Sequence, residues 1–118
     1  MKDKTEALRN FIEESKKNTQ ARIDELMKDE RADEARAFRA AYNIYDVFTA
    51  LIGASEKKAK GDESVFVSEF KKLAVNIPSK WRESLEEARK HNDAERVMIE
   101  EAKLGSADAI VAKFEELF

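Results

Sequence analysis

The chain has 118 residues, 40% of them charged, and its 22 Lys and Arg against 25 Asp and Glu leave a net charge of −3 at pH 7. A hydrophobic content of 42% is too high for a disordered chain, and three Gly and one Pro are too few for a turn-rich β protein. The absence of Cys and the single His exclude disulfide scaffolds, thiolate zinc sites and multi-histidine metal centres. We therefore expect a highly charged helical domain with no metal and no other cofactor.

The apolar residues form no long uninterrupted stretch. The longest runs from about Val47 to Ala54, whereas a membrane-spanning helix needs about 20 apolar residues. No apolar segment of signal-peptide length follows the N-terminal residues. We expect a cytoplasmic protein without membrane attachment, folded as one domain over residues 1–118.

The first helix is predicted over about residues 5–28. Its middle, residues 15–20, is polar, but ion pairs at i,i+4 spacing on both sides favour one continuous helix. The apolar positions recur at helical spacing: Leu8, Phe11, Ile12, Ile23, Leu26 and Met27.

The second helix is predicted over about residues 33–58, with Asp33 as a plausible N-cap. At 100° per residue its apolar side chains cover well over half of the circumference, which is typical of a helix surrounded by other helices. We expect this helix to be central. The apolar residues are Phe38, Ala41, Tyr42, Ile44, Tyr45, Val47, Phe48, Leu51 and Ile52.

The second half of the chain contains the strongest helix-breaking signals. A third helix over residues 62–75 should end by Asn76, because Pro78 disfavours helical backbone in the residue before it. Asn76 or Ser79 then caps a fourth helix, which either runs on to residue 104 or breaks near residues 91–93. Asx residues prefer caps to helix interiors, so we favour a break with Asp93 as the next N-cap. Gly105 resembles a residue just past a helix end, with Ser106 as the N-cap of a last helix.

These elements predict an all-α fold, a compact single-domain bundle of five or six helices. Two long N-terminal helices would form an antiparallel hairpin, and shorter C-terminal helices would pack around the second of them.

The second helix carries a narrow polar strip, Arg39, Asn43 and Asp46, beside Tyr42 and Tyr45. Its members stand four and three residues apart and therefore share one face. The strip is either a small site for a ligand or partner, or a solvent-facing edge or buried network that fixes the helix register. A small-ligand-binding module or a cryptic enzyme that uses this strip requires the three polar side chains to converge on a cavity.

The C-terminal end is apolar: Phe114, Leu117 and Phe118. Termini fray unless they are tied down, so these residues are either docked in the core or part of a subunit interface. Trp81 is more plausibly packed at a helix start than exposed for recognition.

Basic residues gather near predicted helix ends: Lys57, Lys58 and Lys60, then Lys71 and Lys72, then Arg89, Lys90 and His91. At the last turn of a helix, cations complement the helix dipole. A nucleic-acid binder would instead need a continuous basic face, which the acidic net charge disfavours. No arrangement of nucleophile, base and orienting residue emerges, so the sequence favours a protein without enzymatic activity.

Three segments carry a resemblance: Asn43-Ile44-Tyr45-Asp46-Val47-Phe48, Ile77-Pro78-Ser79-Lys80-Trp81 and Ile99-Glu100-Glu101-Ala102-Lys103-Leu104. From about residue 30 onward the chain resembles a group of small all-helical bacterial proteins with no assigned function. The resemblance implies a complete single-domain chain of bacterial cytoplasmic origin and implies no activity or catalytic residue. From the residues themselves we expect an interaction or structural module, with a protein partner or self-association as a homodimer.

Overall fold

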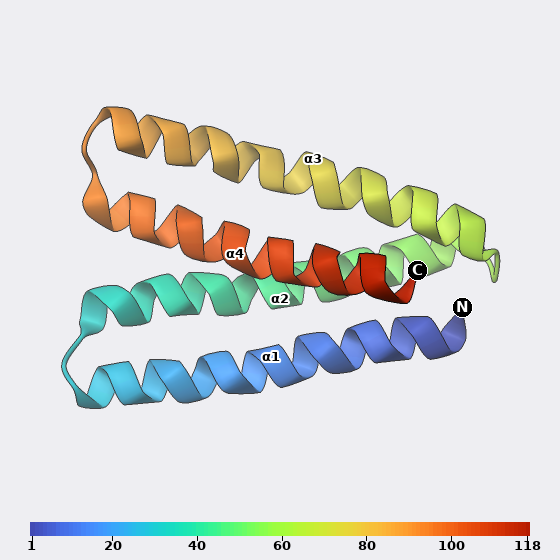
Figure 1. Ribbon diagram of the computed structural model, residues 1–118, viewed down its shortest axis with the longest axis horizontal. Coiled ribbons are helices and arrows are strands. Elements are labelled where there is room, and N and C mark those ends of the chain that lie inside the picture. The colour runs from blue at the N-terminus through green and yellow to red at the C-terminus, as the bar shows by residue number, and fades with distance from the viewer.

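The computed structural model describes all 118 residues as four helices: α1 (Lys2–Lys28), α2 (Ala32–Ala59), α3 (Glu63–Lys90) and α4 (Ala94–Leu117). The all-α prediction is confirmed, but the predicted count of five or six helices is wrong. Consecutive helices run antiparallel, so α2 and α4 run in the same direction (Figure 1). The molecule measures 46 × 32 × 21 Å, and its shortest dimension is that of two helix layers.

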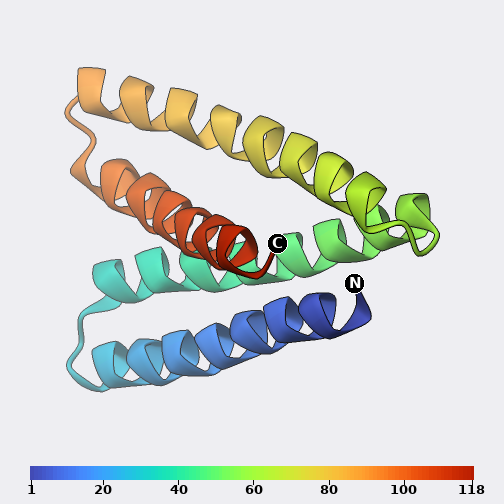
Figure 2. The same cartoon turned by 45° about the vertical axis from the view of Figure 1, so that its right-hand side comes forward.

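Helix α2 is the centre of the bundle, as its wide apolar arc predicts. It packs against α1, α3 and α4, whereas the backbones of α1 and α3 do not approach each other. In two views α3 diverges from α2 toward its C-terminal end, and α4 lies between them there (Figures 1 and 2). Helix α3 is therefore covered by neighbours on fewer sides than α2 is.

Helix α3 does not end before Pro78, which corrects the prediction of two shorter helices. The ring of Pro78 is fully buried inside a helix of 28 residues. A proline in a helix interior costs about 3 kcal/mol, since it removes one N–H donor and crowds the preceding turn. Burial of this ring and of the apolar stripe on both sides of it, from Phe66 to Ala88, offsets that cost.

Helix α4 also continues where a break is predicted, through Gly105 and Ser106. The hydroxyl of Ser106 does not cap a new helix, because it donates to the carbonyl oxygen of Ala41 in α2 at 3.3 Å. Ser106 and Ala107 are both buried. Small residues at this point allow α4 to lie close against α2. The prediction of shorter C-terminal helices is therefore wrong as well.

The predicted break near residues 91–93 is confirmed. His91 ends α3, Asn92 adopts a positive φ of 54°, and the Asp93 carboxylate accepts a hydrogen bond from the N–H of Arg96 at 3.1 Å. Asp33, in contrast, lies in the first turn of α2 and does not cap it, because the N-cap is Arg31. The turn between α2 and α3 uses Lys60 and Gly61, both with positive φ.

Fourteen buried residues from all four helices form one core cluster, and its largest fully buried side chains are aromatic: Phe48, Phe66, Phe70 and Phe114. Trp81 is half-buried at the edge of this cluster. None of the four helices is apolar enough over a sufficient length to cross a lipid bilayer.

Candidate functional site

The polar strip of α2 lies on the outside of the bundle. Arg39, Asn43 and Asp46 are all exposed, and no cavity of the structure is lined by any of them. The Asp46 carboxylate forms an ion pair with the Lys16 ammonium of α1 at 2.7 Å, and this ammonium lies 5.3 Å from the ring centre of Tyr42. The three polar side chains do not converge, so the strip is a charged edge beside α1.

The two tyrosines beside this strip have different environments. Tyr42 is half-buried under Lys16, whereas Tyr45 is only 8% exposed and belongs to the core. The hydrogen bond that the Lys16 ammonium donates to Asp46, more than any other cause, raises the pKa of Lys16 above the usual lysine value. This interaction joins α1 to α2 at the surface of the bundle.

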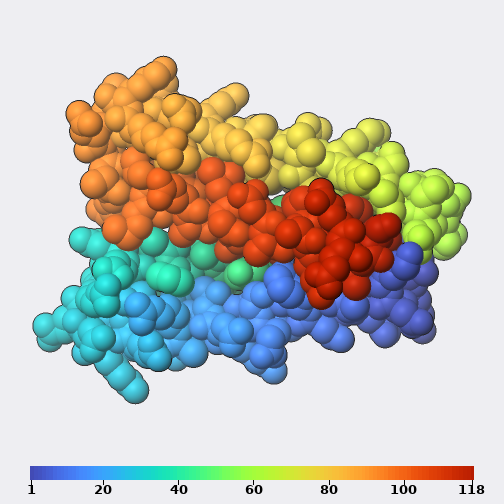
Figure 3. Space-filling view, viewed as in Figure 1, coloured from blue at the N-terminus to red at the C-terminus, as the bar shows by residue number.

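The C-terminal end is docked on the core of its own chain. Phe114 is 2% exposed, and its ring centre lies 4.6 Å from that of Phe70 and 4.9 Å from that of Phe118. Phe118 also lies 5.2 Å from Phe66 and 5.3 Å from the Lys4 ammonium. Leu117 is half-buried against the same cluster. Figure 3 shows this end of α4 in contact with the first turns of both α1 and α3.

A cleft of about 250 Å³ opens between α3 and α4 on the outside of the molecule. Phe70, Ala74 and Pro78 line it from α3, and Ala107, Val111 and Phe114 line it from α4. Val75 stands at its edge with 63% of its surface exposed, more than any other large hydrophobic side chain of the protein. The lining residues Phe70, Pro78, Ala107 and Phe114 are themselves buried, so Val75 and the half-buried Val111 supply most of the exposed apolar surface of the cleft.

The two rims of this cleft carry opposite charges. Lys71 and Arg82 lie on the α3 rim, and Asp108 and Glu115 lie on the α4 rim. Arg82 and Asp108 form a loose ion pair across the cleft at 3.7 Å. Lys71 and Glu115 have no ion-pair partner within the chain. The apolar cleft is thus flanked by one basic rim and one acidic rim.

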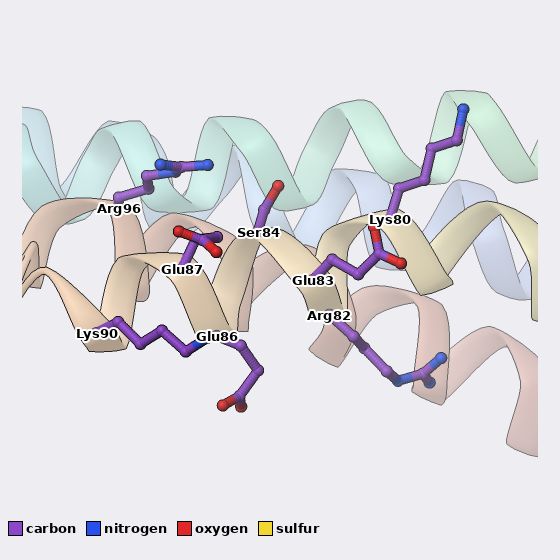
Figure 4. A pocket seen from close by; sticks show the side chains of 8 residues that line it. All are labelled: Lys80, Arg82, Glu83, Ser84, Glu86, Glu87, Lys90 and Arg96. Atoms are coloured by element: carbon purple, nitrogen blue, oxygen red, sulfur yellow. The ribbon is translucent and has the colours of Figure 1, made fainter.

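A larger and shallower hollow of about 780 Å³ lies along α3 and has no hydrophobic lining residue. Its lining contains both basic and acidic side chains, and they extend in different directions from the helix: Lys80 and Arg82 leave α3 on opposite sides (Figure 4). A binding site for a small anion or cation requires convergent groups of one charge, and this hollow does not provide them.

The basic clusters do not form a separate face. Lys57 and Lys58 lie in the last turn of α2, and Arg89 and Lys90 lie in the last turn of α3, as predicted. Lys71 and Lys72 lie in the middle of α3, which corrects their placement at a helix end. Lys58 and Lys72 both pair with Glu69, and Arg89 pairs with Glu86 and Glu101. Acidic side chains therefore interrupt the clusters.

One buried acidic residue, Glu100, is not singled out by the sequence analysis. Glu100 of α4 is 7% exposed, its Oε2 has no hydrogen-bond partner, and its Oε1 accepts from the Lys103 ammonium at 3.3 Å. That ammonium lies 5.9 Å from the Trp81 ring centre. No cavity opens at Glu100, and no three acidic or His side chains of the protein are placed to hold a metal ion. The geometry provides no catalytic arrangement at this carboxylate.

The α3–α4 cleft is the feature that the sequence analysis missed. The prediction that the third helix ends by Asn76 places Val75 at a helix end. It also places Lys71 in a last turn, where its charge would complement the helix dipole. A usable signal was present, because Phe66, Phe70, Ala74, Pro78, Leu85 and Ala88 continue one helical stripe through the proline.

Comparisons with other proteins identify no relative: the scan of protein-family models and the searches of curated proteins and of solved structures give no match.

Proposed function

We propose that this protein is a non-enzymatic interaction module that binds another protein chain through the cleft between α3 and α4. The observation that carries the proposal is Val75, a valine 63% exposed at the edge of an apolar cleft with oppositely charged rims. An apolar surface enclosed by polar residues is typical of a protein–protein interaction site.

The packing of the bundle supports the choice of this surface. Helix α2 has neighbours on three sides, and its polar strip already pairs with α1 through Asp46. Helix α3, like α1, has only α2 and α4 beside it. Its outer edge is therefore free to receive another helix without disturbing the core.

The chemistry of the cleft also favours a protein partner over a small molecule. Its polar groups are four charged side chains at the rims, and its floor is made of apolar side chains. A small-molecule site usually places polar groups inside the pocket, where they fix the ligand's orientation. An amphipathic helix matches an apolar floor with charged rims better.

Site-specific photo-cross-linking tests the proposal. A photoreactive residue replaces Val75 in one variant and Asn76 in a matched control, since Asn76 is also exposed on α3 but does not line the cleft. We expect a discrete cross-linked protein product from position 75 and none from position 76. No product from position 75, or the same product from both positions, contradicts the proposal.

A further inference from the structure

We propose that the chain occupying the cleft is a second copy of this protein, so that the α3–α4 hairpins of two molecules form one four-helix bundle. This inference rests on the proposed function and names its partner. In the arrangement the two-fold axis runs along the cleft, and α3 of each copy lies over α4 of the other.

The register of α3 against α4 brings residues of the two rims to similar heights along the cleft. Phe70 faces Phe114 at one end, with ring centres 4.6 Å apart, and Arg82 faces Asp108 further along at 3.7 Å. Because the helices are antiparallel and each residue advances about 1.5 Å, the Phe70–Phe114 contact places Glu115 within about 3 Å of the height of Lys71, and Val111 within about 3 Å of the height of Val75. A two-fold axis parallel to the helices leaves these heights unchanged.

The charges select this axis among the two-fold axes that place cleft against cleft. With the axis along the cleft, Lys71 meets Glu115 of the partner subunit and Arg82 meets Asp108 of the partner subunit. With the axis perpendicular to the helices, the basic rims meet each other and the acidic rims meet each other. Like charges facing across an interface disfavour that arrangement, because complementary potentials set the register of association.

The apolar residues fit the same arrangement. Val75 covers Val111 of the partner subunit, and the symmetric contact doubles the burial. Ala74 and Ala107 are already buried within each chain, so Val75 and Val111 supply the apolar contact between the two hairpins. Every neighbouring pair of helices in the resulting bundle is antiparallel, which also favours the alignment of helix dipoles.

Sedimentation equilibrium over a range of protein concentrations tests the dimer. We expect the apparent mass to rise from 13.5 kDa toward twice that value as the concentration increases. The variant Val75→Ser should remain monomeric at every concentration and keep its melting temperature when dilute, because Val75 is mostly exposed in the monomer. A protein that is monomeric at all concentrations overturns the inference.

Charge exchange tests the two-fold axis. Lys71→Glu alone and Glu115→Lys alone should each weaken the dimer about tenfold or more, and the double variant should restore it. The double variant Lys72→Glu/Glu116→Lys is the matched control, because neither residue lines the cleft, and it should leave the dimer unchanged. A dimer that is insensitive to the exchange at 71 and 115 overturns the proposed arrangement.

The cross-linking experiment separates failure of this inference from failure of the proposed function. A product from position 75 with the mass of two identical chains supports both. A product that contains a different protein contradicts the homodimer and leaves the interaction function supported.

Discussion

The ammonium of Lys16 in α1 lies 2.7 Å from the carboxylate of Asp46 in α2 and 5.3 Å from the ring centre of Tyr42. Two of the residues that the sequence suggests as a ligand site are thereby used to hold two helices together. Lys16 has only 19% of its side chain exposed, whereas Asp46 is 54% exposed. The pair stabilises the α1–α2 hairpin from the surface.

A double-mutant cycle with Lys16→Met and Asp46→Asn measures this coupling. We expect about 0.5 kcal/mol in urea denaturation at pH 7, since solvent screens a pair that is exposed on one side. Folding raises the pKa of Lys16, principally through its hydrogen bond to Asp46. The stabilisation is therefore fully present below the unfolded-state pKa of the lysine and is lost as pH rises through the folded-state value. A coupling that persists unchanged above both values contradicts this assignment.

Replacing Gly105 by Ala tests the continuity of α4. A Cβ at this position meets no atom within 4 Å, and the backbone is helical, so Gly105→Ala should stabilise the protein by about 0.5–1 kcal/mol in chemical denaturation. Gly61→Ala is the matched control. Gly61 has a φ of +90°, which Ala rarely adopts, so that variant should be destabilised. A loss of stability in both variants indicates a helix end at Gly105.

Pro78 and Gly105 explain why the sequence overestimates the number of helices. Both are local signals for a break, and local preference is worth only about 1–3 kcal/mol. Burial of Pro78, and of Ala107 two residues after Gly105, supplies a comparable free energy from tertiary packing. Local sequence preferences contain no information about that packing. The break at Asn92 and Asp93 is predictable because cap chemistry and solvent exposure agree there.

The candidate site is likewise predictable from the sequence only in part. The helical spacing of Arg39, Asn43 and Asp46 predicts correctly that they share one face, because that depends on α2 alone. Whether the face meets a cavity depends on where the other helices lie, and spacing carries no such information. The exposure of Val75 also depends on the packing of α3 against α4, so it becomes visible only in the folded chain.

The buried carboxylate of Glu100 should reduce the stability of the bundle. Its Oε2 has no partner, and its only ion pair is to Lys103 at 3.3 Å. We expect Glu100→Leu to raise the free energy of unfolding by about 1–2 kcal/mol, because an apolar side chain of similar size removes the desolvation cost. Glu101→Leu is the control. Glu101 is exposed, so its replacement should change stability by less than about 0.5 kcal/mol.

A lower stability of Glu100→Leu than of wild type assigns a different role to this residue. Its carboxylate would then hold Lys103 against the Trp81 ring, a contact of 5.9 Å in the structure. The change in tryptophan fluorescence of the folded variant distinguishes the two cases, since Trp81 is the sole tryptophan.

Truncating Phe118 tests whether the C-terminal end belongs to the core or to a subunit interface. Its ring lies 4.9 Å from Phe114 and 5.2 Å from Phe66 in the same chain, so Phe118→Ala should cost about 1–3 kcal/mol even in dilute solution. Phe114→Ala, at a fully buried position, should cost more, about 3–5 kcal/mol. Glu116→Ala is the exposed control. The measurement is thermal unfolding at low and high protein concentration. A loss in Phe118→Ala that emerges only at high concentration assigns this end of α4 to a subunit interface and contradicts its docking within the chain.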